Sequence, residues 1–313
     1  MDDLAILIPC YNEGITIGKV VKDCLRDTRD IEGRVNIYVY DNNSKDNTVS
    51  EAQTAGAIVR HEYQQGKGNV IRRMFRDIDA KCYILIDGDD TYPTDVIPKM
   101  YRLTIERNLD MVVGDRLSSS YFEENKRPFH NIGNRIVRGS INWLFKSNIR
   151  DIMTGYRAFS YQFVKSYPVV SKGFEIETDM TIFAIENNMA VHNEIIEYKD
   201  RPDGSESKLN TYSDGFKVLK RILISYRDYH PLGFFSIVAM ILVAIALFLF
   251  IPEVWIPYLQ TGLVEKIPTL IVSAFLIIGA IVSWYSGLIL DSVLQKEKRE
   301  FEFRLNLISK NQK

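Results

Sequence analysis

A short apolar run in this chain ends in three carboxylates within four residues. Residues 82–86 (Cys-Tyr-Ile-Leu-Ile) lead directly into the acidic turn 87–90 (Asp-Gly-Asp-Asp). Carboxylate oxygens are the ligands that Mg²⁺ and Mn²⁺ prefer, so Asp87 and Asp89 could share one such cation while a diphosphate completes its octahedral shell. Carboxylates clustered without a cation would repel one another. The alternative interpretation is an acidic turn before a helix, with Pro93 in the helix's first turn.

The elements that must position these carboxylates follow a regular alternation. Apolar strand-like runs at 4–8, 35–40, 57–60 and 83–86 are separated by polar turns and by helical segments expected at 16–25, up to 55 and up to 78. This alternation predicts an α/β fold with a mostly parallel sheet, whose right-handed crossovers bring the turns to one edge. We therefore expect four side chains to converge there: Glu13, Asp41, Lys67 and Asp87.

Two of these turns suit a nucleotide. Asp41 follows a strand, where a carboxylate can accept hydrogen bonds from a base or a ribose. Lys67 stands between Gly66 and Gly68 at a helix start, where backbone N–H groups and the ammonium can meet phosphate oxygens. The spacing is not that of a P-loop, and no G-x-G-x-x-G follows the first strand, which argues against a nicotinamide enzyme. The alternative for Lys67 is a solvated turn lysine.

Composition sets the broad class. The 313 residues are 46% hydrophobic, enough for one large domain and a further element. The net charge of −1 gives no general attraction to nucleic acid. Cys10, Cys24 and Cys82 are few and unpatterned, which indicates a reducing compartment rather than a disulfide scaffold or a zinc cluster. The N-terminus lacks the pattern of a signal peptide, so we expect the first domain to stay in the cytoplasm.

The C-terminal part predicts a membrane hairpin. Residues 232–251 and 269–290 carry no charge over 20 and 22 positions, which is long enough to cross a bilayer. Buried core helices, the alternative, should show polar residues every third or fourth position. Basic residues flank the pair on both outer sides, so both termini should face the cytoplasm. They are Lys217, Lys220, Arg221 and Arg227 before the first span and Lys296, Lys298, Arg299 and Arg304 after the second.

A helix before the first span should lie at the membrane surface. Residues 213–229 place apolar side chains at helical spacing among basic ones, as in helices that lie in the headgroup region; the apolar residues are Phe216, Leu219, Leu223 and Tyr226. The alternative is a core helix with a basic outer face. The predicted organisation is a cytoplasmic catalytic domain at 1–211, the amphipathic helix at 212–230, a transmembrane hairpin at 231–291 and a basic cytoplasmic tail at 292–313.

Four motifs in order resemble the inverting nucleotide-sugar glycosyltransferases of family 2, which have the GT-A fold. They are Pro-Cys-Tyr-Asn-Glu (9–13), Asp-Asn-Asn-Ser (41–44), Gly-Lys-Gly-Asn (66–69) and Asp-Gly-Asp (87–89). Three later segments are similar to the branch that contains dolichol-phosphate mannose synthases and bactoprenol glucosyltransferases. They are Gly-Asp-Arg (114–116), Asp-Ile-Met-Thr-Gly-Tyr-Arg (151–157) and Arg-Pro-Asp-Gly-Ser-Glu-Ser-Lys (201–208). Two spans match the bactoprenol enzymes better than the mannose synthases.

The resemblance implies roles for individual residues. The nucleotide sugar would be bound by Pro9, Tyr11, Glu13, Asp41, Lys67, Asp87, Gly88 and Asp89, with Mg²⁺ or Mn²⁺ on Asp87 and Asp89. Phosphate groups of donor or acceptor would face Arg116, Arg157, Arg201, Ser207 and Lys208. The mannose synthases have Gln where this chain has Thr91, so Asp90 or a water would have to supply the third metal contact.

The resemblance presents Asp151 as catalytic, and two roles stay open for it. Asp151 could accept a proton from the acceptor phosphate, or it could orient Arg157 as an ion-pair partner. A phosphate monoester has a second pKa of about 6, so a strong base is dispensable. A second acidic set, Glu175, Glu177 and Asp179, lies where relatives with sugar acceptors keep their base; its alternative is the acidic first turn of a helix.

The expected reaction is metal-dependent, inverting transfer of one sugar from a nucleoside diphosphate sugar to polyprenyl (undecaprenyl) phosphate on the cytoplasmic face of the inner membrane. UDP-glucose or UDP-N-acetylglucosamine is the expected donor, and the product would serve cell-envelope glycan modification. Alternatives are a mannose synthase that uses GDP-mannose and an anchored transferase with a sugar acceptor. A processive synthase lacks support because no Gln-x-x-Arg-Trp motif is present. Gly279 and Gly287 would allow close helix packing in a homo-oligomer.

Overall fold

The computed structural model describes residues 1–118, 137–145, 149–202, 204 and 211–312, so Ser207 and Lys208 lie outside the described residues. The chain forms two compact units, the first from Met1–Ile222 with Arg304–Lys313 and the second from Leu223–Phe303. The strands of the first unit are β1 (Asp2–Cys10), β2 (Val35–Asp41), β3 (Ile58–His61), β4 (Ala80–Leu85), β5 (Met111–Asp115), β6 (Arg157–Ser160) and β7 (Val191–Ile195). Its helices include α1 (Ile17–Asp27), α2 (Thr48–Thr54), α3 (Lys67–Asp77), α4 (Ile97–Glu106), α7 (Tyr161–Ser166) and α8 (Ile176–Glu186).

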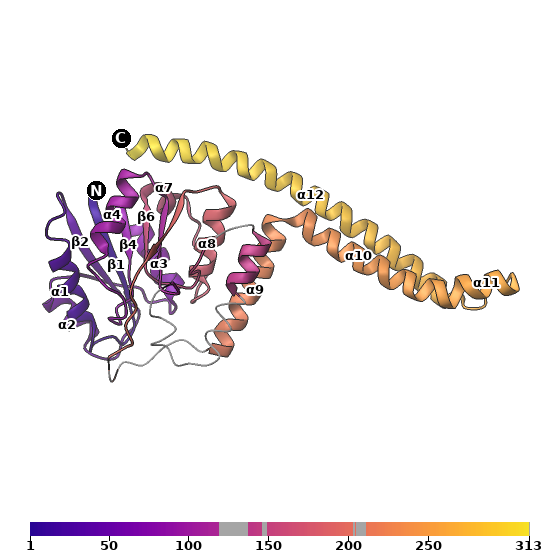
Figure 1. Ribbon diagram of the computed structural model, residues 1–313, viewed down its shortest axis with the longest axis horizontal. Coiled ribbons are helices and arrows are strands. Elements are labelled where there is room, and N and C mark those ends of the chain that lie inside the picture. Colours follow the sequence, from indigo (N-terminus) through magenta and orange to yellow (C-terminus); the bar gives the residue numbers. More distant parts are fainter. Residues whose placement is uncertain (119–136, 146–148, 203, 205–210, 313) are drawn as a thin grey trace. The chain divides into compact units, whose positions relative to one another are not determined.

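The seven strands form one mostly parallel sheet in the order β3-β2-β1-β4-β6-β5-β7, as the sequence predicts. Only β6 runs against its neighbours β4 and β5 among the pairings of the described residues. The chain passes from β1 outward to β3 and then returns to β4 on the other side of β1. The order of strands therefore reverses between β1 and β4, which is where ligands bind in open α/β sheets (Figure 1).

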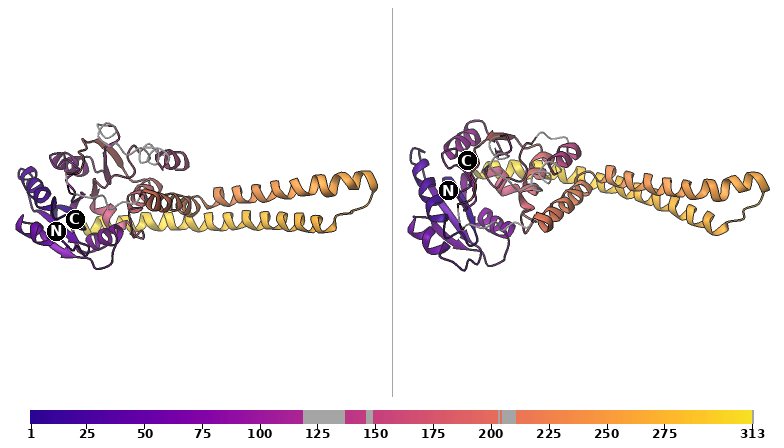
Figure 2. Two further views of the ribbon diagram at one scale, coloured as in Figure 1. Left: turned by 90° about the horizontal axis from the view of Figure 1, so that it is seen from below. Right: turned by 60° about the horizontal axis from the view of Figure 1, so that its bottom comes forward.

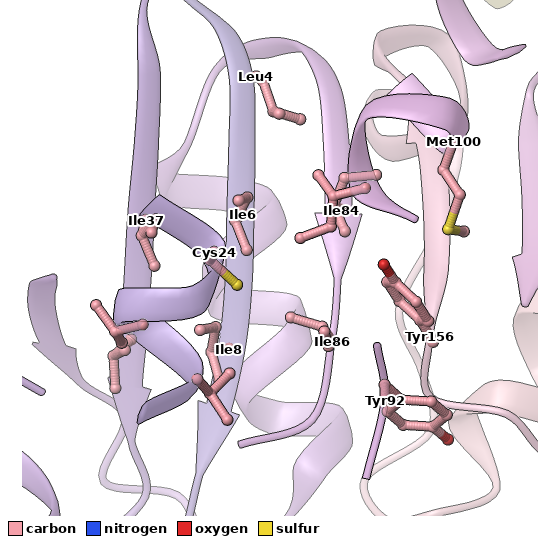
Figure 3. Packing of buried hydrophobic residues seen from close by; sticks show 14 of the residues in the cluster. Leu4, Ile6, Ile8, Cys24, Ile37, Ile84, Ile86, Tyr92, Met100 and Tyr156 are labelled. Carbon is pink, nitrogen blue, oxygen red and sulfur yellow. The ribbon is translucent and has the colours of Figure 1, made fainter. Parts of the chain in front are cut away.

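Both faces of the sheet are covered at its centre, which explains why β1 and β4 are largely apolar. On β1, Ile6 and Ile8 pack with Ile84 and Ile86 in a core that also takes side chains from α1, α2 and α4 (Figure 3). On the opposite face, an aromatic cluster joins α3 and α7 to β4 and β6, and it includes Phe75, Tyr83, Phe159, Phe163 and Tyr167. Strands buried on two sides show continuous rather than alternating hydrophobicity.

Helix α9 (Thr211–Tyr229) crosses the boundary between the two units, and α10 (Pro231–Phe250) follows it. A π-helical turn, η1 (Ile251–Trp255), and α11 (Ile256–Thr261) complete the first arm of the second unit, and α12 (Ile267–Gln312) forms the other with its residues up to Phe303. Within this unit α10 and α12 lie side by side (Figure 2). Gly287 permits the contact, because a Cβ there would lie 3.0 Å from the Cβ of Phe235.

These two arms are long and apolar enough to cross a membrane, by length and composition: they span Pro231–Thr261 and Ile267–Lys310. In each, only 11% of the most apolar 18-residue window is buried. Large side chains such as Phe248 and Phe275 are 77% and 68% exposed. Exposed apolar surface of this extent marks a membrane or protein interaction surface, so the hairpin supports membrane association.

Candidate active site

The turns after β1 and β2 are joined by hydrogen bonds. The backbone N–H of Asn12 donates to the Ser44 hydroxyl at 2.8 Å, and that of Glu13 donates to the Thr48 hydroxyl at 2.9 Å. Pro9 lies within β1, paired with Tyr40 of β2, and Tyr11 is half-buried in the turn that follows. The two turns that the resemblance predicts to bind the nucleoside are thus held together as one surface.

Asp41 ends β2 at this surface. Its carboxylate accepts a hydrogen bond from the Ser44 N–H at 3.2 Å, and its Oδ2 lies 3.4 Å from Nδ1 of His61. The side chain of Asn42 donates to the carbonyls of Glu62 and Gln64 at 2.7 and 2.9 Å. The loop that precedes Lys67 is therefore attached to the Asp41 turn.

Lys67 is held between two carboxylates. Its Nζ lies 2.6 Å from Oδ1 of Asp87 and 2.8 Å from Oε1 of Glu177 on α8. Burial opposes the charge on Lys67, but the two carboxylates outweigh it and raise its pKa. Burial raises the pKa of Glu177, and the ammonium works against that shift. Lys67 is thus a structured part of the site rather than a solvated turn lysine, and Glu177 is a site residue that the sequence suggested only as a possible base.

Asp89 is almost fully buried and forms an ion pair with an arginine. Nη2 of Arg201 lies 2.5 Å from its Oδ2, and the Thr91 hydroxyl donates to its Oδ1 at 2.7 Å. Nη1 of the same arginine lies 3.8 Å from Glu13. Burial, and next the charge of Asp87, raise the pKa of Asp89, while Arg201 lowers it. The two carboxylates of the 87–89 turn therefore repel each other and are each compensated by a separate basic side chain.

Asp90, one of the two groups expected to supply the third metal contact, pairs with a residue of α1 in this structure. Asp90 adopts a left-handed backbone conformation with φ of 60°, and its carboxylate pairs with Lys19 of α1 at 2.7 Å. The Thr91 hydroxyl is used as a donor to Asp89. Gly88, the remaining residue of the motif, accepts a hydrogen bond from the Thr16 hydroxyl through its carbonyl at 2.6 Å. This contact fixes the turn against the start of α1.

The predicted convergence of turns is visible at Cys10. Burial raises the pKa of this thiol well above its ordinary value, and four carboxylates raise it further: Glu13, Asp41, Asp87 and Asp89. These groups act on Cys10 because the ends of β1, β2 and β4 meet around it. The cysteine itself is buried and has no chemical role in our interpretation.

Asp151 pairs with Arg116. Nε of Arg116 donates to Oδ2 of Asp151 at 2.8 Å, and the Arg116 backbone N–H donates to the same oxygen at 3.2 Å. The guanidinium carbon also lies 5.9 and 5.6 Å from the ring centres of Tyr92 and Tyr198. Sequence reasoning missed both tyrosines, because aromatic residues in separate segments carry no signal of a shared cation.

The expectation for Arg157 does not hold. Its side chain is fully buried, and it donates to the carbonyls of Ile152 and Thr154 at 2.6 and 3.1 Å and to the Thr181 hydroxyl at 2.8 Å. Burial lowers its pKa to about 10. Arg157 therefore braces the 152–154 segment from within instead of facing a phosphate, and it is not the ion-pair partner of Asp151.

The side chains of the site could coordinate a divalent cation only together with oxygen atoms of a bound ligand. Among the described residues, no group of three or more His, Cys, Asp or Glu side chains is arranged to hold a metal. Asp87 and Asp89 supply hard oxygens whose mutual repulsion a cation would relieve, and a diphosphate would have to complete the shell.

Comparison with known proteins gives a consistent result. Residues 5–167 match the family described as glycosyl transferase family 2. Glycosyltransferase AglJ of Haloferax volcanii is 32% identical over 82% of this chain and 83% of its own length, and a dolichyl-phosphate hexose transferase of the same organism is 28% identical over 71% and 93%. The fold resembles a glucosyl-3-phosphoglycerate synthase from Mycobacterium tuberculosis, crystallised with Mn²⁺, UDP-glucose and phosphoglyceric acid, with a TM-score of 0.54 and 18% identity over 72% of this chain and 80% of that one.

Proposed function

The chain belongs to glycosyl transferase family 2 and is a hexosyltransferase, and from this premise we propose that it transfers one sugar from a nucleoside diphosphate sugar to a polyprenyl phosphate. The observation that carries the proposal is the pairing of Asp87 with Lys67 and of Asp89 with Arg201 where the strand order reverses. Such an arrangement of two carboxylates and two cations matches a metal-bound diphosphate.

The donor would lie along the turns of β1, β2 and β4. Asp41 would accept hydrogen bonds from the nucleoside, and Asp87 and Asp89 would hold Mg²⁺ or Mn²⁺, which supplies neutralisation of the charge that grows on the departing diphosphate. Lys67 would contribute to the same neutralisation from its position beside Asp87. The solved relative named above contains Mn²⁺ and UDP-glucose, which supports a uridine donor.

The reaction would be a single displacement. An oxygen of the acceptor phosphate forms a bond to the anomeric carbon while the bond from that carbon to the diphosphate oxygen breaks, and the electron pair leaves with the nucleoside diphosphate. The acceptor is ionised near neutral pH, since its second pKa is about 6, so no strong base is needed. Asp151 would then serve to orient Arg116 toward the acceptor phosphate, because the two already form a buried pair.

The C-terminal part of the chain supports a lipid acceptor. On α9, Phe216, Leu219 and Leu223 are 70%, 45% and 58% exposed, whereas Val218 and Ile222 are buried. This exposed apolar face suits a helix at the membrane surface, next in sequence to the two membrane-length helices. A dolichyl-phosphate hexose transferase among the relatives supports a polyprenyl phosphate acceptor. We place the catalytic unit and both termini on the cytoplasmic side of the inner membrane, from the distribution of basic residues.

A reconstitution assay tests the proposal. The full chain in bilayer vesicles is incubated with undecaprenyl phosphate, Mg²⁺ or Mn²⁺, and one of UDP-glucose, UDP-N-acetylglucosamine or GDP-mannose, and the extracted lipid is weighed by mass spectrometry. We expect a lipid one hexosyl unit heavier with a uridine donor and none with Asp89→Asn. Product from GDP-mannose alone would make the protein a mannose synthase, and transfer only to soluble sugars would refute the lipid acceptor.

A further inference from the structure

Two carboxylates in the first turn of α8 each form an ion pair with a basic side chain from a different part of the first unit. Glu177 pairs with Lys67 of residues 66–68, which we call the donor loop because the proposed function brings the donor diphosphate to it, and Asp179 pairs with Arg221 of α9. Nε and Nη2 of Arg221 both donate to Oδ1 of Asp179, at 2.8 and 2.6 Å. Asp179 is buried and the Arg221 side chain is only 25% exposed, so this is a largely desolvated pair rather than a surface contact. Arg221 is therefore not directed at lipid headgroups, which differs from the expectation that it lies among the basic surface residues of a helix in the headgroup region.

The second carboxylate oxygen of Asp179, Oδ2, contacts the segment on which the donor loop packs. The buried Ser171 hydroxyl donates to Oδ2 of Asp179 at 2.7 Å. The Gly68 N–H in turn donates to the carbonyl of Lys172 at 3.0 Å. Polar contacts thus run without interruption from α9 through Asp179 and the 171–172 backbone to the glycine that follows Lys67.

The glycines on both sides of Lys67 are needed for this contact. A Cβ on Gly68 would lie 2.0 Å from the Ser171 carbonyl oxygen, and one on Gly66 would lie 2.3 Å from that of Lys172. Gly66 also has a φ of 128°, which L side chains rarely adopt. The Lys67 loop is therefore packed directly on the 171–172 backbone, and any shift of that backbone must move the loop.

We propose that Arg221 is a positioning residue for the donor site: through Asp179 and Ser171 it holds the backbone on which the Lys67 loop rests. The consequence for catalysis rests on the proposed function. Helix α9 leads into the membrane-length helix α10 after a single residue, so this path links the donor loop to the element next to the membrane-length helices. Removal of one partner of a buried ion pair leaves the other charge uncompensated, which makes the link sensitive to substitution.

Hydrogen exchange measures this link without any ligand. In the full chain, Arg221→Gln should speed deuterium uptake at the Gly68 amide by about tenfold, because the acceptor backbone loses its support. The matched control is Lys220→Gln, which removes the same charge from the exposed neighbouring position. Arg221→Lys keeps the charge and should restore part of the protection. Uptake at Gly68 that is equal in Arg221→Gln and the control would overturn the inference.

A double-variant test and a binding test separate the remaining explanations. Asp179→Asn should produce the same exchange effect, and Asp179→Asn with Arg221→Gln should be no worse than either alone; additive effects would contradict a shared contact. Arg221→Gln should also weaken Mn²⁺-UDP binding severalfold in the absence of lipid. If it raises only the KM for polyprenyl phosphate and leaves exchange unchanged, Arg221 contacts the acceptor and the inference is wrong. A wild-type protein that binds no nucleotide refutes the proposed function, while the exchange result still decides the role of Arg221.

Discussion

Gly155→Ala is a selective probe of the proposed metal site. A Cβ built on Gly155 would lie 2.4 Å from Oδ2 of Asp87 and 2.9 Å from its Cγ, where ordinary contacts begin at 3.4 Å. The backbone of Gly155 is not in the left-handed region. The three atoms nearest to this Cβ all belong to the carboxylate, so the methyl group must displace it by about 1 Å, or the fold must absorb an overpacking cost of about 1–3 kcal/mol.

The displacement should be read out as metal affinity. A displaced carboxylate resembles the loss of an orienting contact in a metal site, which typically costs about 10–100-fold in affinity. We expect Mn²⁺ binding in the presence of UDP, followed by electron paramagnetic resonance, to weaken by about that factor in Gly155→Ala. Gly139→Ala is the matched control, since a Cβ at Gly139 meets nothing within 4 Å. Thermal unfolding of both variants reports whether the fold has absorbed the strain instead.

One result would refute this reasoning. If Gly155→Ala unfolds at the wild-type temperature and binds Mn²⁺-UDP as tightly as Gly139→Ala, the carboxylate of Asp87 can move without consequence. Asp87 would then not be a metal ligand.

Three further substitutions test the charges around the site. Lys67→Met leaves Glu177 buried without its basic partner. Burial raises the pKa of Glu177 and Lys67 lowers it, so the pKa should rise further in this variant. The folded variant then keeps a proton on Glu177 that the unfolded chain releases. Its thermal stability should therefore fall more than that of wild type as pH rises from about 5 to 7, and Lys67→Met with Glu177→Gln should lose this dependence. Thr91→Val removes the hydroxyl that orients the second carboxylate of the motif, so calorimetry should show roughly tenfold weaker Mn²⁺ binding; unchanged binding would contradict this role. Asp151→Asn should slow transfer at every pH because Arg116 loses its bidentate partner, whereas a rate that recovers at high pH would show that Asp151 removes a proton.

The alternation of strands and helices was predictable because the central strands of the sheet, such as β1 and β4, are buried on two faces. Continuous apolar runs such as 82–86 are the direct result of that burial, and β4 (Ala80–Leu85) overlaps this run. Asp87 and Lys67 were expected to meet because parallel strands place their carboxyl-end turns on one edge, and they lie 2.6 Å apart. The membrane-length helices follow from composition alone.

The contacts of Arg157 and Arg116 were not predictable from the sequence, because they depend on β6, which runs antiparallel to its neighbours. Arg157 begins β6, which inserts antiparallel between β4 and β5, and this position buries its side chain. One of the two roles left open for Asp151 was to orient Arg157, yet Asp151 binds Arg116, which directly follows β5. Local spacing carries no information on strand direction, so it could not distinguish the two arginines.

The charge balance of the site also depends on contacts between distant segments. Glu13, Asp87, Asp89 and Glu177 meet two basic side chains, Lys67 and Arg201, so this group carries two more negative than positive charges. A divalent cation would cancel that difference, whereas a monovalent one would leave it half compensated. The sequence contains these charges but does not show which of them meet. Glu177, which α8 brings to Lys67, contributes one of the two excess negative charges, and the same helix contacts both the donor loop and α9.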